Sequence, residues 1–187
     1  MDPRTLDAQA RHTGHCCWVE MRAFELLGAW SASVPEPEVK AMVATHSRQR
    51  AWHAELWHDL LPTAGDGGIE GFITPANPGV EAFVEALAQP EAPERTIEKL
   101  AGAYRVLTPR TVAAYTEQLA DASPITDGPA IRALRLVLAD QVEHWREGEA
   151  MLQALLRSGR DVDRAAGHQA RLEALLVEAG GLLGTGR

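Results

Sequence analysis

The sequence PAIRALRLVLADQVEHWREGEAMLQALLR, residues 129–157, carries the most regular helical pattern in the chain. Its apolar residues recur at the spacing of one face of an α-helix. Gln141 lies near the middle of this apolar stripe, and His144, three residues later, lies toward its flank. We therefore expect one long helix here, with two polar side chains directed toward the interior.

Three further long helices are expected N-terminal to this one, over residues 13–33, 38–61 and 94–122. Prolines mark their ends, and Pro109 falls inside the third of them, where it is expected to kink or split the helix. Short links force neighbouring helices to run antiparallel, whereas the roughly thirty residues between the second and third helices let the chain cross the bundle's length. The pattern predicts an all-α fold: an antiparallel four-helix bundle with one long crossover.

The 187 residues suit a single domain spanning 1–187, with its core at about 13–157. A short helix over 80–88 is expected within the crossover. A short C-terminal helix, at about 163–180, is expected to cap the outside of the bundle. Ala and Leu are abundant, which favours helix over sheet.

The formal net charge of −8 and the lack of a Lys/Arg-rich run exclude nucleic acid as an expected partner. An anionic membrane is excluded on the same ground, and no apolar run approaches the ~20 residues that cross a bilayer. Residues 1–11 carry no apolar signal core, and the adjacent Cys16 and Cys17 suit no disulfide framework. We expect a cytoplasmic protein.

Each long helix places a polar residue near the centre of its apolar face. Glu20 is the most informative of these, because a buried carboxylate costs several kcal/mol unless it is paired or bound to a metal. It is flanked in projection by Cys17, Phe24 and Leu27. The other three helices contribute the following residues: His46, Arg50 and His53 from the second, Tyr104, Thr111 and Tyr115 from the third, and Gln141 and His144 from the fourth.

These positions resemble the pattern of ferritin-like di-iron proteins, which place one Glu on each of two helices and Glu-x-x-His on the other two. In helix order this chain has Glu20, Arg50-x-x-His53, no acidic residue near Thr111, and Gln141-x-x-His144. The segments 53–57 and 138–149 also resemble helices of ferritin-like bacterial proteins. The resemblance implies a ferritin-like bundle over most of the chain. Since only one of four expected carboxylates is present, it implies a degenerate metal site.

Our first hypothesis is a charged central pocket without a metal cofactor, in which Glu20 pairs with Arg50. Such a pocket would bind a small organic molecule or serve as a structural core. If catalysis occurs there, Glu20 is the base, Arg50 orients an anionic substrate, and His53 or His144 transfers protons. Gln141, Tyr104, Tyr115 and Thr111 would line the pocket.

Two rival hypotheses stand beside the first. In one, Glu20, His53 and His144 hold a single iron or manganese ion for an oxidase or oxygenase, with Gln141 and a tyrosine around these ligands. This requires Arg50 to swing away. In the other, the chain has no active site and is an interaction module that forms a homodimer through an exposed apolar helix face.

The remaining polar residues receive structural interpretations. His46 is interpreted as a hydrogen-bonded core histidine, and Gln141 as a core amide bonded to a tyrosine. Four carboxylates are expected on a solvated face: Glu55, Asp59, Glu143 and Glu147. The loop Gly65–Gly68 lacks the Lys and Ser/Thr of a phosphate-binding loop.

Overall fold

The computed structural model describes residues 6–63 and 68–184, and within these ranges it contains helices and no strand. The loop Gly65–Gly68 lies outside the described residues except for Gly68. The main helices are α1 (Leu6–Ser33), α2 (Pro37–His58), α3 (Pro78–Ala88), α4 (Thr96–Ala101), α5 (Thr108–Asp121), α6 (Gly128–Leu155) and α7 (Gly159–Glu178). The 3₁₀ turns are η1 (Ile69–Gly71) and η2 (Pro93–Arg95), and the π-helix η3 (Gly102–Leu107) joins α4 to α5.

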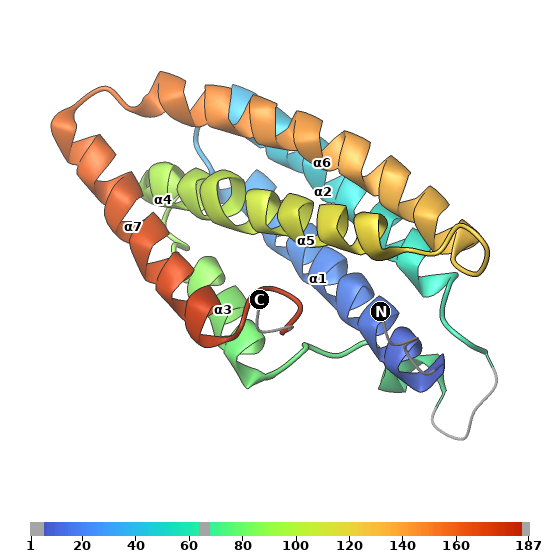
Figure 1. Cartoon of the computed structure of the whole chain (residues 1–187). Coiled ribbons are helices and arrows are strands. Elements are labelled where there is room, and N and C mark those ends of the chain that lie inside the picture. The colour runs from blue at the N-terminus through green and yellow to red at the C-terminus, as the bar shows by residue number, and fades with distance from the viewer. Residues whose placement is uncertain (1–5, 64–67, 185–187) are drawn as a thin grey trace.

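The predicted all-helical fold is confirmed. Figure 1 shows α1 and α6 running in one direction, and α2 and the continuous α4–η3–α5 helix running in the other. The segment between α2 and α4 returns along the length of the molecule and contains η1 and α3. Helix α2 packs on α1 and α6, and α5 packs on α6. None of the described helices is both long and apolar enough to span a membrane.

Local sequence explains where several helices begin. Pro37, Pro78 and Pro129 lie in the first turns of α2, α3 and α6, where the N–H groups have no partner within the helix, so that proline costs no helical hydrogen bond. The Asn77 side chain caps α3 by accepting hydrogen bonds from the N–H groups of Gly79 and Val80.

The sequence predicts a kink or a split at Pro109, and the third helix is not split there. It stays helical through the proline, but the turn directly ahead widens into η3, where the Thr108 N–H bonds to the carbonyl of Ala103, five residues earlier. Proline has no N–H, and its ring crowds the carbonyl four residues before it. A wider π turn at this place accommodates that ring without breaking the helix.

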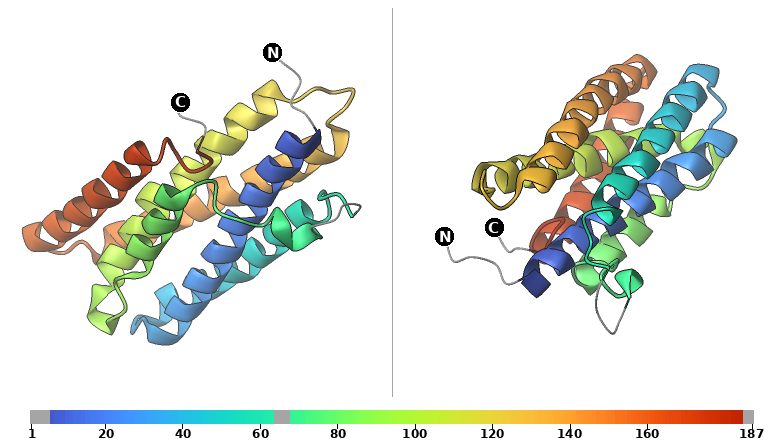
Figure 2. Two further views of the ribbon diagram at one scale, coloured as in Figure 1. Left: turned by 90° about the horizontal axis from the view of Figure 1, so that it is seen from below. Right: turned by 90° about the vertical axis from the view of Figure 1, so that its right-hand side faces the viewer.

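Helix α7 is longer than the predicted 163–180 cap and is more than an outer cover. It lies against α3 and α4, as Figure 2 also shows. Ala165, Leu172 and Leu176 of α7 are buried in the same cluster as residues of α1 and α4. The expected inner face of α1 also needs correction, because Phe24 is 42% exposed.

The apolar core forms two clusters. The larger contains Val19, Trp30 and Val43 beside residues of α3, α4, η3 and α7. The smaller, toward the other end of α1 and α2, contains Cys17, Trp57 and residues of α5 and α6. The polar residues predicted to point inward lie between these two clusters, and they form the candidate site.

Candidate functional site

A layer of buried polar side chains crosses the bundle between the two apolar clusters. We call it the central polar layer, and its members are at most 2% exposed. Every long helix contributes: Glu20 from α1; His46, Arg50 and His53 from α2; Tyr104, Thr108, Thr111 and Tyr115 from the η3–α5 helix; Gln141 and His144 from α6.

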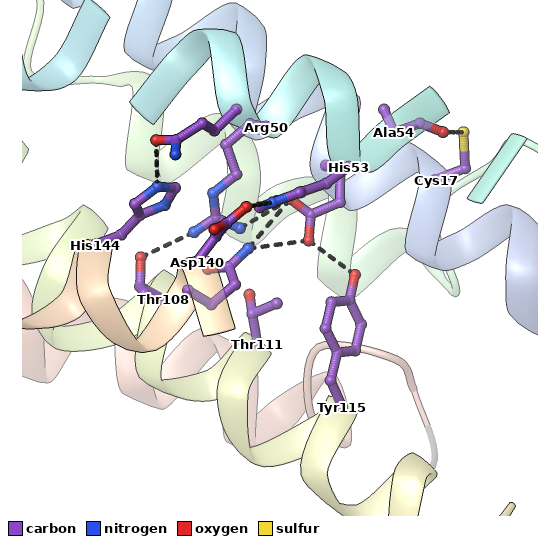
Figure 3. A network of polar contacts seen from close by, with 12 residues as sticks. Cys17, Arg50, His53, Ala54, Thr108, Thr111, Tyr115, Asp140 and His144 are labelled. Carbon is purple, nitrogen blue, oxygen red and sulfur yellow. Dashed lines mark hydrogen bonds and ion pairs between the residues drawn. The ribbon is translucent and has the colours of Figure 1, made fainter. Parts of the chain in front are cut away.

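Glu20 and Arg50 form a buried ion pair at the middle of this layer. Arg50 Nη1 donates to Glu20 Oε2 at 3.0 Å, and Arg50 Nη2 donates to Thr108 Oγ1 at 3.0 Å. Figure 3 shows the Arg50 side chain reaching from α2 toward Thr108. Because Thr108 directly follows η3, the π turn helps to set where this hydroxyl lies.

Both carboxylate oxygens of Glu20 accept further hydrogen bonds. Tyr115 donates its hydroxyl to Oε1 at 3.0 Å, and Gln141 Nε2 lies 3.2 and 3.3 Å from the two oxygens. Burial raises the pKa of the Glu20 carboxyl, but the Arg50 charge, the adjacent His53 ring and the hydrogen bond from Arg50 outweigh burial and lower the pKa to about 2. Glu20 is therefore a charged, fully bonded carboxylate.

His53 connects Glu20 to the surface. Its Nδ1 lies 3.6 Å from Glu20 Oε2, and its Nε2 lies 2.9 Å from Oδ2 of Asp140, whose side chain is 30% exposed. Only the contact with Asp140 is within hydrogen-bond distance, and Nδ1 has no hydrogen-bond partner among the described residues. The arrangement is a carboxylate–imidazole–carboxylate chain that runs from the bundle centre to the side where α2 meets α6.

His46 belongs to a second hydrogen-bonded chain, which also ends at a partly exposed carboxylate of α6. Tyr104 donates its hydroxyl to His46 Nδ1 at 2.7 Å, and His46 Nε2 donates to Glu147 at 2.9 Å. Burial raises the pKa of Tyr104, so its phenol is the donor. The Tyr104 ring packs directly over Gly148, where a Cβ would come within 2.1 Å of the ring.

His144 stacks on His46 with 4.0 Å between ring centroids, and its Nε2 lies 2.7 Å from Oε1 of Gln49. Burial lowers the pKa of His144 to about 2, aided by the charges of His46, Arg50 and His53, so this ring is neutral. Since Nε2 donates to the Gln49 oxygen, the Nδ1 of His144 is an acceptor.

The structure thus brings most of the predicted residues into one connected set, with two differences. Gln141 bonds to Glu20 and not to a tyrosine. Glu147 does more than lie on a solvated face, because it bonds to His46 although its side chain is 53% exposed. Thr111, expected to line the pocket, is fully buried and donates its hydroxyl to the carbonyl of Leu107 in its own helix.

Sequence reasoning missed Asp140 and Gln49 as partners of the site. Both lie on the edge of their helix's apolar stripe and are partly exposed. A periodicity argument assigns such residues to the surface. The available signal was spacing: Asp140 precedes His144 by four residues, which places the two on one face of α6.

The residues present do not fit a bound metal ion. Arg50 Nη1 bonds to the same Glu20 oxygen that faces His53, so a cation already lies at that carboxylate. His144 directs Nε2 toward Gln49. Across residues 6–63 and 68–184, no three His, Cys, Asp or Glu side chains are grouped to hold a metal ion.

Comparison of the chain with protein-family models, with curated proteins and with solved structures finds no match in any of the three.

Proposed function

We propose that this chain is a metal-independent protein of the ferritin-like type, whose centre is a Glu20–Arg50 ion pair that binds a small polar organic molecule. The direction of the four long helices and the crossover between α2 and α4 support the ferritin-like part of this proposal. A shared fold says little about chemistry, so the functional part rests on the central polar layer.

The observation that carries the proposal is the 3.0 Å contact between Arg50 Nη1 and Glu20 Oε2, with both side chains at most 1% exposed. A guanidinium bonded to the only carboxylate of the central polar layer repels any metal ion that approaches it. The site then keeps one positive and one negative group, which suits polar recognition better than Lewis-acid chemistry.

Support for a small-molecule ligand comes from unused hydrogen-bonding atoms. Arg50 Nε, His53 Nδ1, Gln141 Oε1 and His144 Nδ1 are buried and have no hydrogen-bond partner among the described residues. Arg50 Nε can only donate, Gln141 Oε1 and His144 Nδ1 accept, and the role of His53 Nδ1 depends on its tautomer. Buried polar atoms are nearly always bonded, so four within one layer favour a polar ligand that supplies at least one acceptor and two donors.

Metal content tests the proposal directly. Protein purified without a His-tag is assayed by mass spectrometry and then titrated anaerobically with ferrous iron. We expect no stoichiometric metal and no saturable uptake. Roughly one metal ion per chain, lost in Glu20→Ala and kept in Glu25→Ala, would support a mononuclear centre instead. Glu25 is a suitable control because it lies on the same helix but is 48% exposed at its side chain.

The ligand part has its own test. Native mass spectrometry of the purified protein is expected to detect a small molecule that co-purifies with wild type and is reduced in Gln141→Leu, which removes one acceptor. The control is Gln153→Leu, since Gln153 lies on the same helix but bonds to Glu149 away from the layer. Equal spectra for all three proteins would leave the centre as a structural core.

A further inference from the structure

One guanidinium group links the long helices of the bundle. Arg50 projects from α2, bonds to Glu20 of α1, and bonds to Thr108 of α5. Gln141 of α6 donates to the same carboxylate, and Tyr115 of α5 donates to its other oxygen. Residues of all four long helices therefore surround the position between Glu20 and Thr108, and this position holds one cation, the Arg50 guanidinium.

The charges around this position balance for a monovalent cation. Glu20 is the only carboxylate in the central polar layer, and its charge is equal in size and opposite in sign to that of Arg50. Tyr115 is protonated, because burial raises its pKa well above the ordinary range, and His144 is neutral. His53 has Asp140 as a second carboxylate partner. A divalent ion in place of Arg50 would leave a buried net positive charge, which is costly.

The shape of the position also suits a planar cation. A guanidinium carries N–H donors in a fixed fork, and here two of its nitrogens meet acceptors on different helices, a carboxylate and a hydroxyl, each at 3.0 Å. A metal ion prefers several anionic or imidazole ligands that converge on one point. The ligand set therefore matches a guanidinium and not a metal.

We propose that Glu20 and Thr108, oriented by Tyr115 and Gln141, form a binding site for a planar monovalent cation that the protein's own Arg50 fills. This inference rests on the proposed metal-independent function. The chemical class that the site takes, when the Arg50 side chain is removed, is a guanidinium-type cation.

Chemical rescue tests this proposal. Arg50→Ala is expected to lower Tm, and guanidinium or methylguanidinium chloride, at concentrations far below those that denature, is expected to raise it again by several degrees relative to equal ionic strength of sodium chloride. Wild type and the control Arg110→Ala should show no such rise, because Arg110 pairs with Glu173 at the surface and its side chain is 48% exposed. Absence of rescue, or an equal rise with manganese chloride, would overturn the proposal.

A second pair of variants covers the case in which Arg50→Ala does not fold. Arg50→Lys keeps a monovalent charge, whereas Arg50→Met keeps a similar length without charge. We expect the Lys variant to have a Tm between those of wild type and the Met variant. A Met variant as stable as the Lys variant would overturn the cation site. Metal uptake by wild type would instead overturn the metal-independent function, so the two failures are distinguishable.

Discussion

At the scale of single residues, the Glu20–Arg50 pair makes a direct prediction about stability. Replacing Glu20 by Gln leaves the Arg50 charge buried without its counter-ion, which typically costs about 3–5 kcal/mol. Urea unfolding should detect this as a large drop in the midpoint. The control is Glu25→Gln, whose partner Arg22 is exposed, and which should change the free energy of unfolding by less than about 1 kcal/mol. Similar losses in both variants would contradict a special role for the buried pair.

The pKa of Glu20 adds a dependence on pH at this same residue. Its pKa is about 2 when folded, against an ordinary value of 4.5, so the carboxylate stabilises the fold fully above pH 4.5 and loses this contribution as the pH falls toward 2. The shift corresponds to about 3 kcal/mol. Since protonated Glu20 resembles Gln, the stability difference between wild type and Glu20→Gln should shrink across that window. Unfolding curves between pH 6 and pH 2 measure it, and a constant difference would contradict the assigned pKa.

At the scale of elements, the π-helix η3 and α6 approach each other very closely at one position. Tyr104 of η3 packs so closely on Gly148 that a Cβ there would lie 2.1 Å from the ring. Gly148→Ala should therefore destabilise the protein by about 1–3 kcal/mol and weaken the Tyr104–His46 bond. The control is Gly167→Ala in α7, where nothing lies within 4 Å and alanine should stabilise by about 0.5–1 kcal/mol. Thermal unfolding compares the two variants. Equal effects would contradict a steric conflict between a Cβ at position 148 and the Tyr104 ring.

The same elements show how far sequence reasoning reached. Proline positions and helical periodicity located the long helices, because both act locally. Glu20, Arg50 and His53 could be placed at the centre because an ionisable residue within an apolar stripe must find a partner in the interior. The π turn could not be predicted, because a proline inside a helix can be accommodated by a kink, a break or a wider turn, and the sequence pattern does not distinguish these outcomes. The exposure of Phe24 likewise depends on the angle between α1 and its neighbours, which periodicity does not contain.

At the scale of the whole molecule, the central polar layer divides the apolar core into two clusters and ties the long helices to one register. Apolar contacts alone would tolerate small slides of one helix along another, but each bond to Glu20 fails if α1 shifts by one turn, about 5.4 Å. We therefore expect the layer to define the alignment of the bundle, while the two apolar clusters supply most of the stability.

The crossover is attached to this bundle at a different place. Gly14 lies on α1, and a Cβ there would come within 2.0 Å of the backbone oxygen of Phe72, so no side-chain rotation can relieve the clash. Gly14→Ala should lift the segment around Phe72 from α1, lower the free energy of unfolding by about 1–3 kcal/mol, and speed cleavage by a glutamyl protease at Glu70. Gly71→Ala is the control, because nothing lies within 4 Å of its Cβ position.

This variant also tests whether the crossover and the centre are independent. Gly14 lies six residues from Glu20 on the same helix, roughly 9 Å along its axis. At that separation and with no shared partner, the effects of Gly14→Ala and Glu20→Gln should add to within about 0.5 kcal/mol in the double variant. Additive losses would mean that the crossover can loosen while the ion pair stays intact. A coupling well above that value would mean that the crossover holds α1 in the register that the Glu20–Arg50 pair requires, and the independence argued here would be wrong.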